Sequence, residues 1–483
     1  MNKLLLLAVM FGGLAYPVAS HAAWLADMIS VPGETADLTP GVQGVQAEVN
    51  RLNFGSDLWY DSTHRLLYGL GDAGPAGDWA YQTRVQVFNL DINTTTGKIN
   101  TFELAQTIGF KTADGSQSFL GGRPAFINGS PTVLGNSFDP EGFVLAPNGH
   151  MYVSDEWGPS IYEFEPVTVG GAIEARFVRS IDVPARWLPV DANGVVNYEA
   201  GADPSLPALV SGRQNGRGLE SLTLSPDGTM LTVMMQAPLQ DEGNRKVRNE
   251  RLGTYDLVQE KWTGEYVYQV ESLDDINARV APDTFGATQQ GRNITPNAMT
   301  DLGGGKYLVL ERDNRGIGTA NPIGADQVLS HVGTKRVYQI DVNSATDVSG
   351  VTLPTNGDLV GAGIVPISKL LYLDIDKTLQ DAGLKSVEKF EGLALIQGDL
   401  PIMLTANDND YSVLEVVAGG ISTLYDVCTD GTQLPLNSDL GGRHLLPANL
   451  YSFAVPEPST IGLLPAAVAG VLVLRRRRSR PIE

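Results

Sequence analysis

Residues 139–156 read DPEGFVLAPNGHMYVSDE, and residues 220–233 read ESLTLSPDGTMLTV. In both stretches a Pro-Asn-Gly or Pro-Asp-Gly turn separates two runs in which apolar and polar residues alternate. Because Pro presets the backbone for a turn and Gly accepts a positive φ, each stretch predicts a β-hairpin. Glu141 lies before the first turn and Asp155 after it, so antiparallel pairing returns both side chains to one rim of the sheet.

The same hairpin recurs along the chain and begins each time with a polar lead residue. Five leads stand 77 to 94 residues apart, namely Ser56, Glu141, Glu220, Asn297 and Glu391. A repeated all-β unit is typical of a propeller, whose blades usually take roughly 40 to 50 residues. We therefore predict an all-β propeller of five or six blades with long insertions between strands. The strongest helix signal is the stretch 368–384, and turn-prone residues interrupt it.

The composition is consistent with many turns around a large core. The 483 residues include 54 Gly and 28 Pro, and 42% of them are hydrophobic. The single cysteine, Cys428, cannot form an internal disulfide, so packing must stabilise the fold. A net charge of −21 repels nucleic acid and attracts cations, which argues against binding to a phosphate backbone. Solubility alone is the alternative explanation of this acidity.

The N-terminus has the composition of a targeting segment. Lys3, the apolar run 4–14 and the small residues before Ala23 indicate a signal peptide over residues 1–23. We therefore expect export through the inner membrane to the periplasm, the cell surface or the extracellular matrix. After the signal peptide, the sequence pattern predicts an N-terminal lead-in at 24–50, the propeller domain at 51–430 and a linker at 431–454.

The C-terminus has three features in a fixed order. Pro456-Glu457-Pro458 precedes an apolar run, 461–474, and four arginines, 475–478. Basic residues after an apolar segment orient it in the inner membrane. The tail, 455–483, resembles a PEP-CTERM sorting signal, which implies transient membrane retention and processing by an exosortase. A generic tail anchor is the alternative.

Three pairs of motifs mark the body of the chain: Asp139-Pro140-Glu141-Gly142 with 154–160, Asn215-Gly216-Arg217-Gly218-Leu219-Glu220 with 224–228, and Phe390-Glu391-Gly392-Leu393 with 407–410. In these motifs the chain resembles the phytase-like family, also described as having esterase-like activity of phytase, over about residues 50–420. The resemblance implies an exported hydrolase on a propeller. Gln236 and Asn297 depart from the family's pattern, and each removes a negative charge.

Carboxylates and an amide lead the predicted inner strands. The first strand of each propeller blade lines the channel, so Glu141, Glu220, Asn297 and Glu391 should meet at one mouth. Crowded carboxylates raise one another's pKa unless a cation lies among them. Oxygen ligands without His or Cys favour Ca²⁺, and Asp408 of the stretch 407–410 is the fifth predicted ligand. Alternatively, each Glu caps backbone N–H groups within its own blade.

Basic residues lie beside these carboxylates in the sequence. The predicted substrate-binding residues are Arg213, Arg217, Arg312 and Lys389, because an Arg fork holds a phosphate at two points. A calcium-bound water would then permit hydrolysis of a phosphate ester without a protein nucleophile. The predicted catalytic residues are Glu220, Arg217 and Asp155. The alternative for each Arg is a solvated salt bridge.

Three classes of function remain open from the residues. The first is calcium-dependent hydrolysis of phytate or another phosphate ester. The second is hydrolysis of a lactone or sugar ester at the same channel mouth. The third is a non-catalytic surface or matrix protein, which the sorting tail favours. Phosphate release and lactone opening, each measured with and without a chelator, separate these classes.

Overall fold

The computed structural model describes residues 23–456 except 40–41, 43, 77–79, 203 and 323–329. Nearly all of the predicted signal peptide and of the predicted sorting tail lies outside the described residues. Among the described residues, no helix has both the length and the hydropathy needed to cross a membrane.

Five groups of four strands account for most of the described chain, and we number them blades 1 to 5. Blades 1 and 2 comprise β2 (Asp57–Asp61), β3 (Leu66–Leu70), β4 (Arg84–Ile92) and β5 (Ile99–Lys111), then β6 (Pro140–Leu145), β7 (Met151–Asp155), β8 (Ser160–Val169) and β9 (Ala172–Ile181). Blades 3 and 4 comprise β12 (Leu219–Leu224), β13 (Met230–Met235), β14 (Asn249–Asp256) and β15 (Lys261–Gln269), then β16 (Ile294–Gly303), β17 (Lys306–Asp313), β18 (Lys335–Asp341) and β19 (Ser368–Asp374). Blade 5 comprises β20 (Lys389–Ile396), β21 (Ile402–Asp408), β25 (Ala448–Ala454) and β1 (Trp24–Val31).

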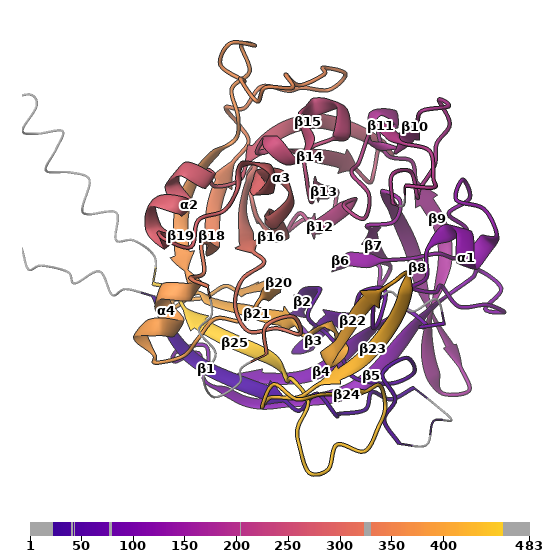
Figure 1. The fold of residues 1–483 in the computed structure, drawn as a ribbon. Helices are drawn as coiled ribbons and strands as arrows, with labels where there is room; N and C mark the ends of the chain where they lie inside the picture. Colours follow the sequence, from indigo (N-terminus) through magenta and orange to yellow (C-terminus); the bar gives the residue numbers. More distant parts are fainter. Residues whose placement is uncertain are drawn as a thin grey trace, which may run out of the picture.

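The first strands of the blades form a ring around a central channel. Each of β2, β6, β12, β16 and β20 contacts the next, and β20 contacts β2 to close the ring (Figure 1). The other strands of each blade follow outward in antiparallel order, and a short parallel pairing joins β5 of blade 1 to β9 of blade 2. This arrangement confirms the predicted all-β propeller.

Blade 5 is built from both ends of the described chain. β1 pairs with β25 from Trp24↔Ala454 to Val31↔Ala448, and β25 pairs with β21. The predicted lead-in, 24–50, and the predicted linker, 431–454, therefore each contribute a strand to the propeller, contrary to that interpretation. The physical reason is burial, because all seven residues of β25 are buried and five of them belong to the two hydrophobic clusters beside blade 5.

Shorter elements fill the insertions between strands. The helices are α1 (Pro124–Asn128), α2 (Leu273–Val280), α3 (Gln290–Asn293) and α4 (Ile375–Asp381), with one-turn 3₁₀ helices at 185–187, 240–242, 244–246, 287–289 and 410–412. The minor strands are β10 (Val190–Asp191), β11 (Leu209–Ser211), β22 (Val413–Ala418), β23 (Ile421–Val427) and β24 (Gln433–Pro435). The strongest helix signal, 368–384, divides at Asp374 into β19 and α4, because the Asp374 side chain accepts from the Lys377 N–H and caps the helix.

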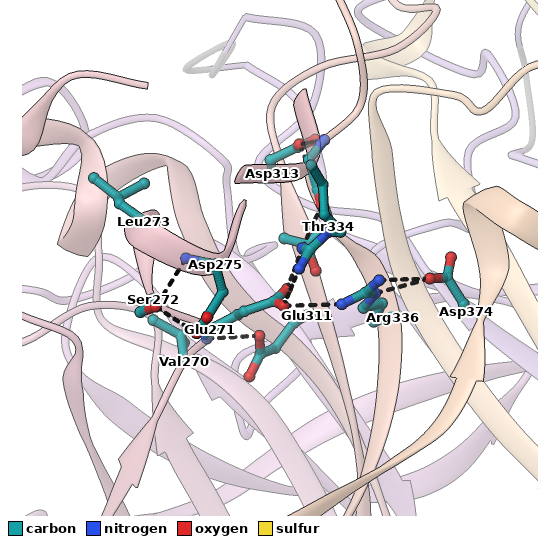
Figure 2. Close-up of polar contacts among 12 residues, drawn as sticks. Val270, Glu271, Ser272, Leu273, Asp275, Glu311, Asp313, Thr334, Arg336 and Asp374 are labelled. Atoms are coloured by element: carbon teal, nitrogen blue, oxygen red, sulfur yellow. Dashed lines mark hydrogen bonds and ion pairs between the residues drawn. The ribbon is translucent and has the colours of Figure 1, made fainter. Parts of the chain in front are cut away.

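Neighbouring blades pack closely at the ring and are also joined by ion pairs. A Cβ atom on Gly142 would lie 2.6 Å from the Leu222 nitrogen of the next blade, so this position requires glycine. Between blades 3 and 4, Arg336 of β18 donates to Glu271, which follows β15, at 2.8 Å and to Asp374 at 2.9 Å (Figure 2). The backbone N–H of Glu271 also donates to Glu311 of β17 at 3.0 Å (Figure 2). These contacts hold the ring in one geometry.

Candidate functional site

The lead residues of four blades occupy the extra positions of β-bulges. The pairing of first and second strands shifts register at Glu141, Glu220, Asn297 and Glu391. A bulge turns its extra side chain away from the regular pleat and often lies beside a functional site. All four side chains are buried at one end of the channel, which we call the mouth. Blade 1 lacks such a bulge, and Ser56 precedes β2.

An amide separates two carboxylates at the mouth. The Nδ2 of Asn297 donates to Oε1 of Glu220 and to Oε1 of Glu391, the latter at 3.4 Å. Its Oδ1 accepts from the Thr295 hydroxyl at 2.9 Å, which fixes the orientation of the amide. The structure thus brings together three of the five predicted metal ligands, Glu220, Asn297 and Glu391. Within this trio, Asn297 acts as a hydrogen-bond donor to both carboxylates.

A second amide links Glu220 to an arginine. Gln236 donates to Oε2 of Glu220 at 2.5 Å and accepts from the Arg217 guanidinium at 2.5 Å. Arg217 forms no ion pair with any described residue. Burial lowers the pKa of Arg217 to about 10; Glu156 opposes this shift, and Arg292 and Arg312 add to it. Arg217 is therefore a half-buried cation held at the mouth by a neutral partner.

Arg312 is the second cation at the mouth. Its guanidinium forms a buried ion pair with Glu391, and its Nε has no hydrogen-bond partner among the described residues. Burial opposes a charge on Arg312, but Glu391 and Glu220 outweigh it and hold its pKa above the usual value. Arg312 therefore stays charged beside the carboxylates of blades 3 and 5.

Three carboxylates form an acidic group on the blade 2 side of the mouth. Oxygens of Asp139, Glu141 and Glu156 lie within 4.8 Å of one another. Burial and the neighbouring carboxylates raise the pKa of Asp139 and Glu141 well above the usual values. Burial raises the pKa of Glu156 to about 7, although Arg217 and Arg213 oppose that shift. A cation among these oxygens would relieve the repulsion.

The acidic group has the chemistry of a hard-cation site. Its donors are all carboxylate oxygens, as Ca²⁺ prefers. Glu141 is only 8% exposed, and its carboxylate accepts no hydrogen bond from any described residue, which leaves both oxygens available. Of the five predicted metal ligands, only Glu141 belongs to this group.

Asp408 and Lys389 lie at the next part of the rim. Lys389 donates to Asp408 at 3.1 Å and to Asp410 at 2.5 Å, and Asn53 donates to Asp408 at 2.8 Å. Burial raises the pKa of Asp408, but Lys389 and Asn53 outweigh it and lower the pKa overall. The predicted substrate-binding Lys389 and the predicted ligand Asp408 thus neutralise each other.

Two predicted site residues serve the framework of blade 2. Asp155 is fully buried and accepts from the N–H groups of Asp139, Trp157 and Gly158 and from the Ser160 hydroxyl, at 2.8 to 3.1 Å. Arg213 is also fully buried, and its guanidinium donates only to backbone carbonyls, those of Trp157, Gly158, Tyr198 and Gln214. These contacts leave neither side chain free for a substrate, contrary to the roles expected for them.

Two carboxylates at the mouth were missed as site residues by the sequence reasoning. Asp139 and Glu156 flank the hairpin quoted first, so their signal lay in that motif beside Glu141 and Asp155. Arg292, a basic residue of the short helix α3, lies close enough to Arg217 to lower the pKa of Arg217. The mouth therefore has two sides, with the acidic group on one and Arg217, Arg292 and Arg312 on the other.

The comparisons with known proteins agree with the sequence. The chain matches the phytase-like family, described as having esterase-like activity of phytase, over residues 52–411, and it belongs to that family. An uncharacterized secreted protein of Arthroderma benhamiae is 26% identical over 314 residues, which cover 57% of this chain and 58% of the relative. The match thus spans little more than half the length of that relative.

Solved propellers resemble the chain at low identity. The periplasmic gluconolactonase of Pseudomonas aeruginosa is 12% identical, with 90% of this chain and 100% of that chain covered and a TM-score of 0.31. A putative 6-phosphogluconolactonase of Bacteroides uniformis is 10% identical, with 89% and 100% covered and a TM-score of 0.30.

Proposed function

We propose that this protein is an exported, calcium-dependent hydrolase of phosphate esters that acts at the channel mouth. One observation carries the proposal: an acidic group with a free carboxylate adjoins a set of arginines at the mouth. Asp139, Glu141 and Glu156 would hold Ca²⁺, which would supply positive charge to polarise an ester and acidify a bound water. The secreted relative supports export.

The residues of this chain have separate tasks in this proposal. Arg217 and Arg312 face the acidic group from blades 3 and 4 and bind the anionic oxygens of the ester, since a guanidinium donates to two oxygens at once. Gln236 positions Arg217 without neutralising it, because an amide accepts its hydrogen bond. Glu220 accepts hydrogen bonds from both Gln236 and Asn297, and so fixes the two amides relative to each other.

Calcium binding is tested on the chain without its tail by calorimetry and thermal melting. We expect Ca²⁺ to raise the melting temperature, and Glu141→Gln to weaken binding at least about tenfold, because one charged ligand is lost. Glu165→Gln is the matched control, since Glu165 is exposed on β8 away from the mouth. Equal calcium affinity in the Glu141→Gln and control variants would refute the assignment of the ligands.

Substrate binding is tested with Arg217→Lys. Lysine keeps the charge but loses the two-point fork, so we expect turnover of a phosphate ester to fall at least about tenfold with a smaller effect on melting. Arg65→Lys, on an exposed turn of blade 1, is the control. Turnover that falls only in proportion to stability would make Arg217 a structural residue.

Assays of phosphate release and lactone opening, each with and without a chelator, separate the other two classes of function. Opening of a lactone without phosphate release would favour a sugar-ester or lactone hydrolase at this mouth. Absence of both activities with calcium bound would favour a non-catalytic surface or matrix protein.

A further inference from the structure

The two ends of the described chain leave the propeller at the same rim. Trp24 at the start of β1 pairs with Ala454 at the end of β25, and Ala454 also pairs with Ile402 at the start of β21. Ile402 in turn pairs with Ile396 at the end of β20, whereas Lys389 and Asp408 pair at the mouth end of the same strands. Both ends of the described chain therefore lie on the face opposite the mouth, which we call the far face.

The far face has an apolar centre. The ends of all five inner strands enclose a cavity of about 390 Å³ there, whose lining includes Leu58, Trp59, Phe143, Leu222, Met299 and Leu393. The turns of this face also expose apolar side chains. Val258, between β14 and β15, is 75% exposed, and Trp24 and Val169 are partly exposed. Tryptophan and aliphatic side chains at a surface fit the interfacial region of a bilayer.

The sequence beyond β25 places an apolar segment close to this face. Only six residues, 455–460, separate Ala454 from the apolar run 461–474, and six extended residues span at most about 20 Å. A run of fourteen apolar residues is short for a hydrocarbon core of about 30 Å, so its flanking residues are drawn toward the interface. The four arginines that follow orient the run with its N-terminal end outside.

We propose that the far face rests on the outer surface of a lipid bilayer while the run 461–474 is embedded, and that the mouth points away from the membrane. The short connection holds the far face at the interface, and the exposed apolar residues of that face contact lipid. The acidic group and the arginines then face the aqueous phase, where a soluble anionic substrate has free access. This orientation does not depend on the proposed hydrolase activity.

The orientation is tested with the full chain in vesicles of phosphatidylethanolamine and phosphatidylglycerol. Val258→Cys marks the far face, and Val417→Cys is the matched control on the β22–β23 hairpin, within the segment that joins the mouth ends of β21 and β25. Each thiol carries a fluorophore, and a nitroxide on lipid headgroups quenches it. Cys428 is buried, so the unmodified chain treated in the same way gives the background.

We expect the Val258→Cys label to be quenched at least threefold more than the Val417→Cys label. The difference should vanish when the chain ends at Val455, because that chain lacks the apolar run. Equal quenching at the two positions of the full chain, stronger quenching at Val417→Cys, or failure of the full chain to bind vesicles would each overturn the proposal.

Discussion

At the scale of single residues, the two amides of the mouth explain how its carboxylates coexist. Asn297 stands where an acid would bring a third negative charge between Glu220 and Glu391, and it supplies N–H donors instead. Gln236 lies between Glu220 and Arg217, donates to Glu220 and accepts from Arg217, and adds no charge. Because a buried carboxylate needs donors or a counter-ion, both amides stabilise the mouth.

Replacing Asn297 by Asp should destabilise the protein. The variant adds a charge between two carboxylates and removes their shared donor, so we expect a loss of about 1–3 kcal/mol at pH 7 without calcium. Urea unfolding measures it. Asn148→Asp is the control, because Asn148 lies in an exposed turn where only its side-chain oxygen is used. Equal stability of the two variants would contradict the role of the amide.

A buried acid outside the mouth predicts a pH dependence. Glu250 of β14 is fully buried, and neither carboxylate oxygen has a hydrogen-bond partner among the described residues. Burial and then Glu311 raise its pKa well above the usual value. The folded state therefore keeps a proton that the unfolded chain releases near pH 4.3, and stability falls as pH rises through the range above that value.

Glu250→Gln should remove this part of the pH dependence. An amide stays neutral at every pH, so we expect the variant to match the unmodified protein near pH 4.5 and to exceed its stability by at least about 1 kcal/mol at pH 8. Melting temperatures across this range provide the measurement, with Glu165→Gln as the exposed control. A parallel pH profile for the variant and the unmodified protein would exclude Glu250 as the source.

At the scale of elements, one aspartate recurs at the end of the second strand, or two residues after it, in four blades. Asp72, Asp155, Asp313 and Asp408 each accept from the backbone N–H two residues later, at 2.8 to 3.1 Å. The hairpin pattern in the sequence placed Asp155 correctly at the rim. It could not show the loop donors that saturate the carboxylate, because those donors depend on the path of the chain after the strand.

Asp313→Ala should be the most destabilising change among these aspartates. Asp313 accepts from the buried Lys335 ammonium at 2.8 Å, so the variant leaves an unpaired charge in the core. We expect a loss of about 3–5 kcal/mol, read from urea unfolding. Adding Lys335→Met should restore part of it by removing that charge. A loss below about 1 kcal/mol, or no recovery in the double variant, would argue against this role.

At the scale of the whole molecule, the repeat predicted the ring but not its closure. The hairpin leads located the inner strands because turn residues and alternation are local signals. β1 and β25 pair across more than 400 residues of sequence, so no local pattern could show that the predicted lead-in and linker belong to one blade. Four of the five predicted metal ligands were chosen as equivalent residues of the inner strands, whereas the acidic group combines Glu141 with Asp139 and Glu156, which flank the two strands of one hairpin.

Truncation tests the closure directly. A chain that ends at Pro447 lacks β25, which leaves β1 without a partner and β21 without its outer partner, so we expect this chain to lose cooperative melting and to be digested by protease. A chain that ends at Pro456 keeps the strand and should melt as a folded protein. Similar melting of the two chains would show that residues 448–454 act as a linker after all.

The composition of blade 5 has a consequence for biogenesis. A chain that crosses a membrane from its N-terminus delivers β1 first and β25 almost last. Until β25 arrives, β1 lacks the strand that joins it to β21, and β21 in blade 5 has an unpaired edge of the kind that promotes aggregation. The propeller therefore completes its fold only once nearly the whole chain is available, so the proposed export would require the unfinished protein to be protected until β25 arrives.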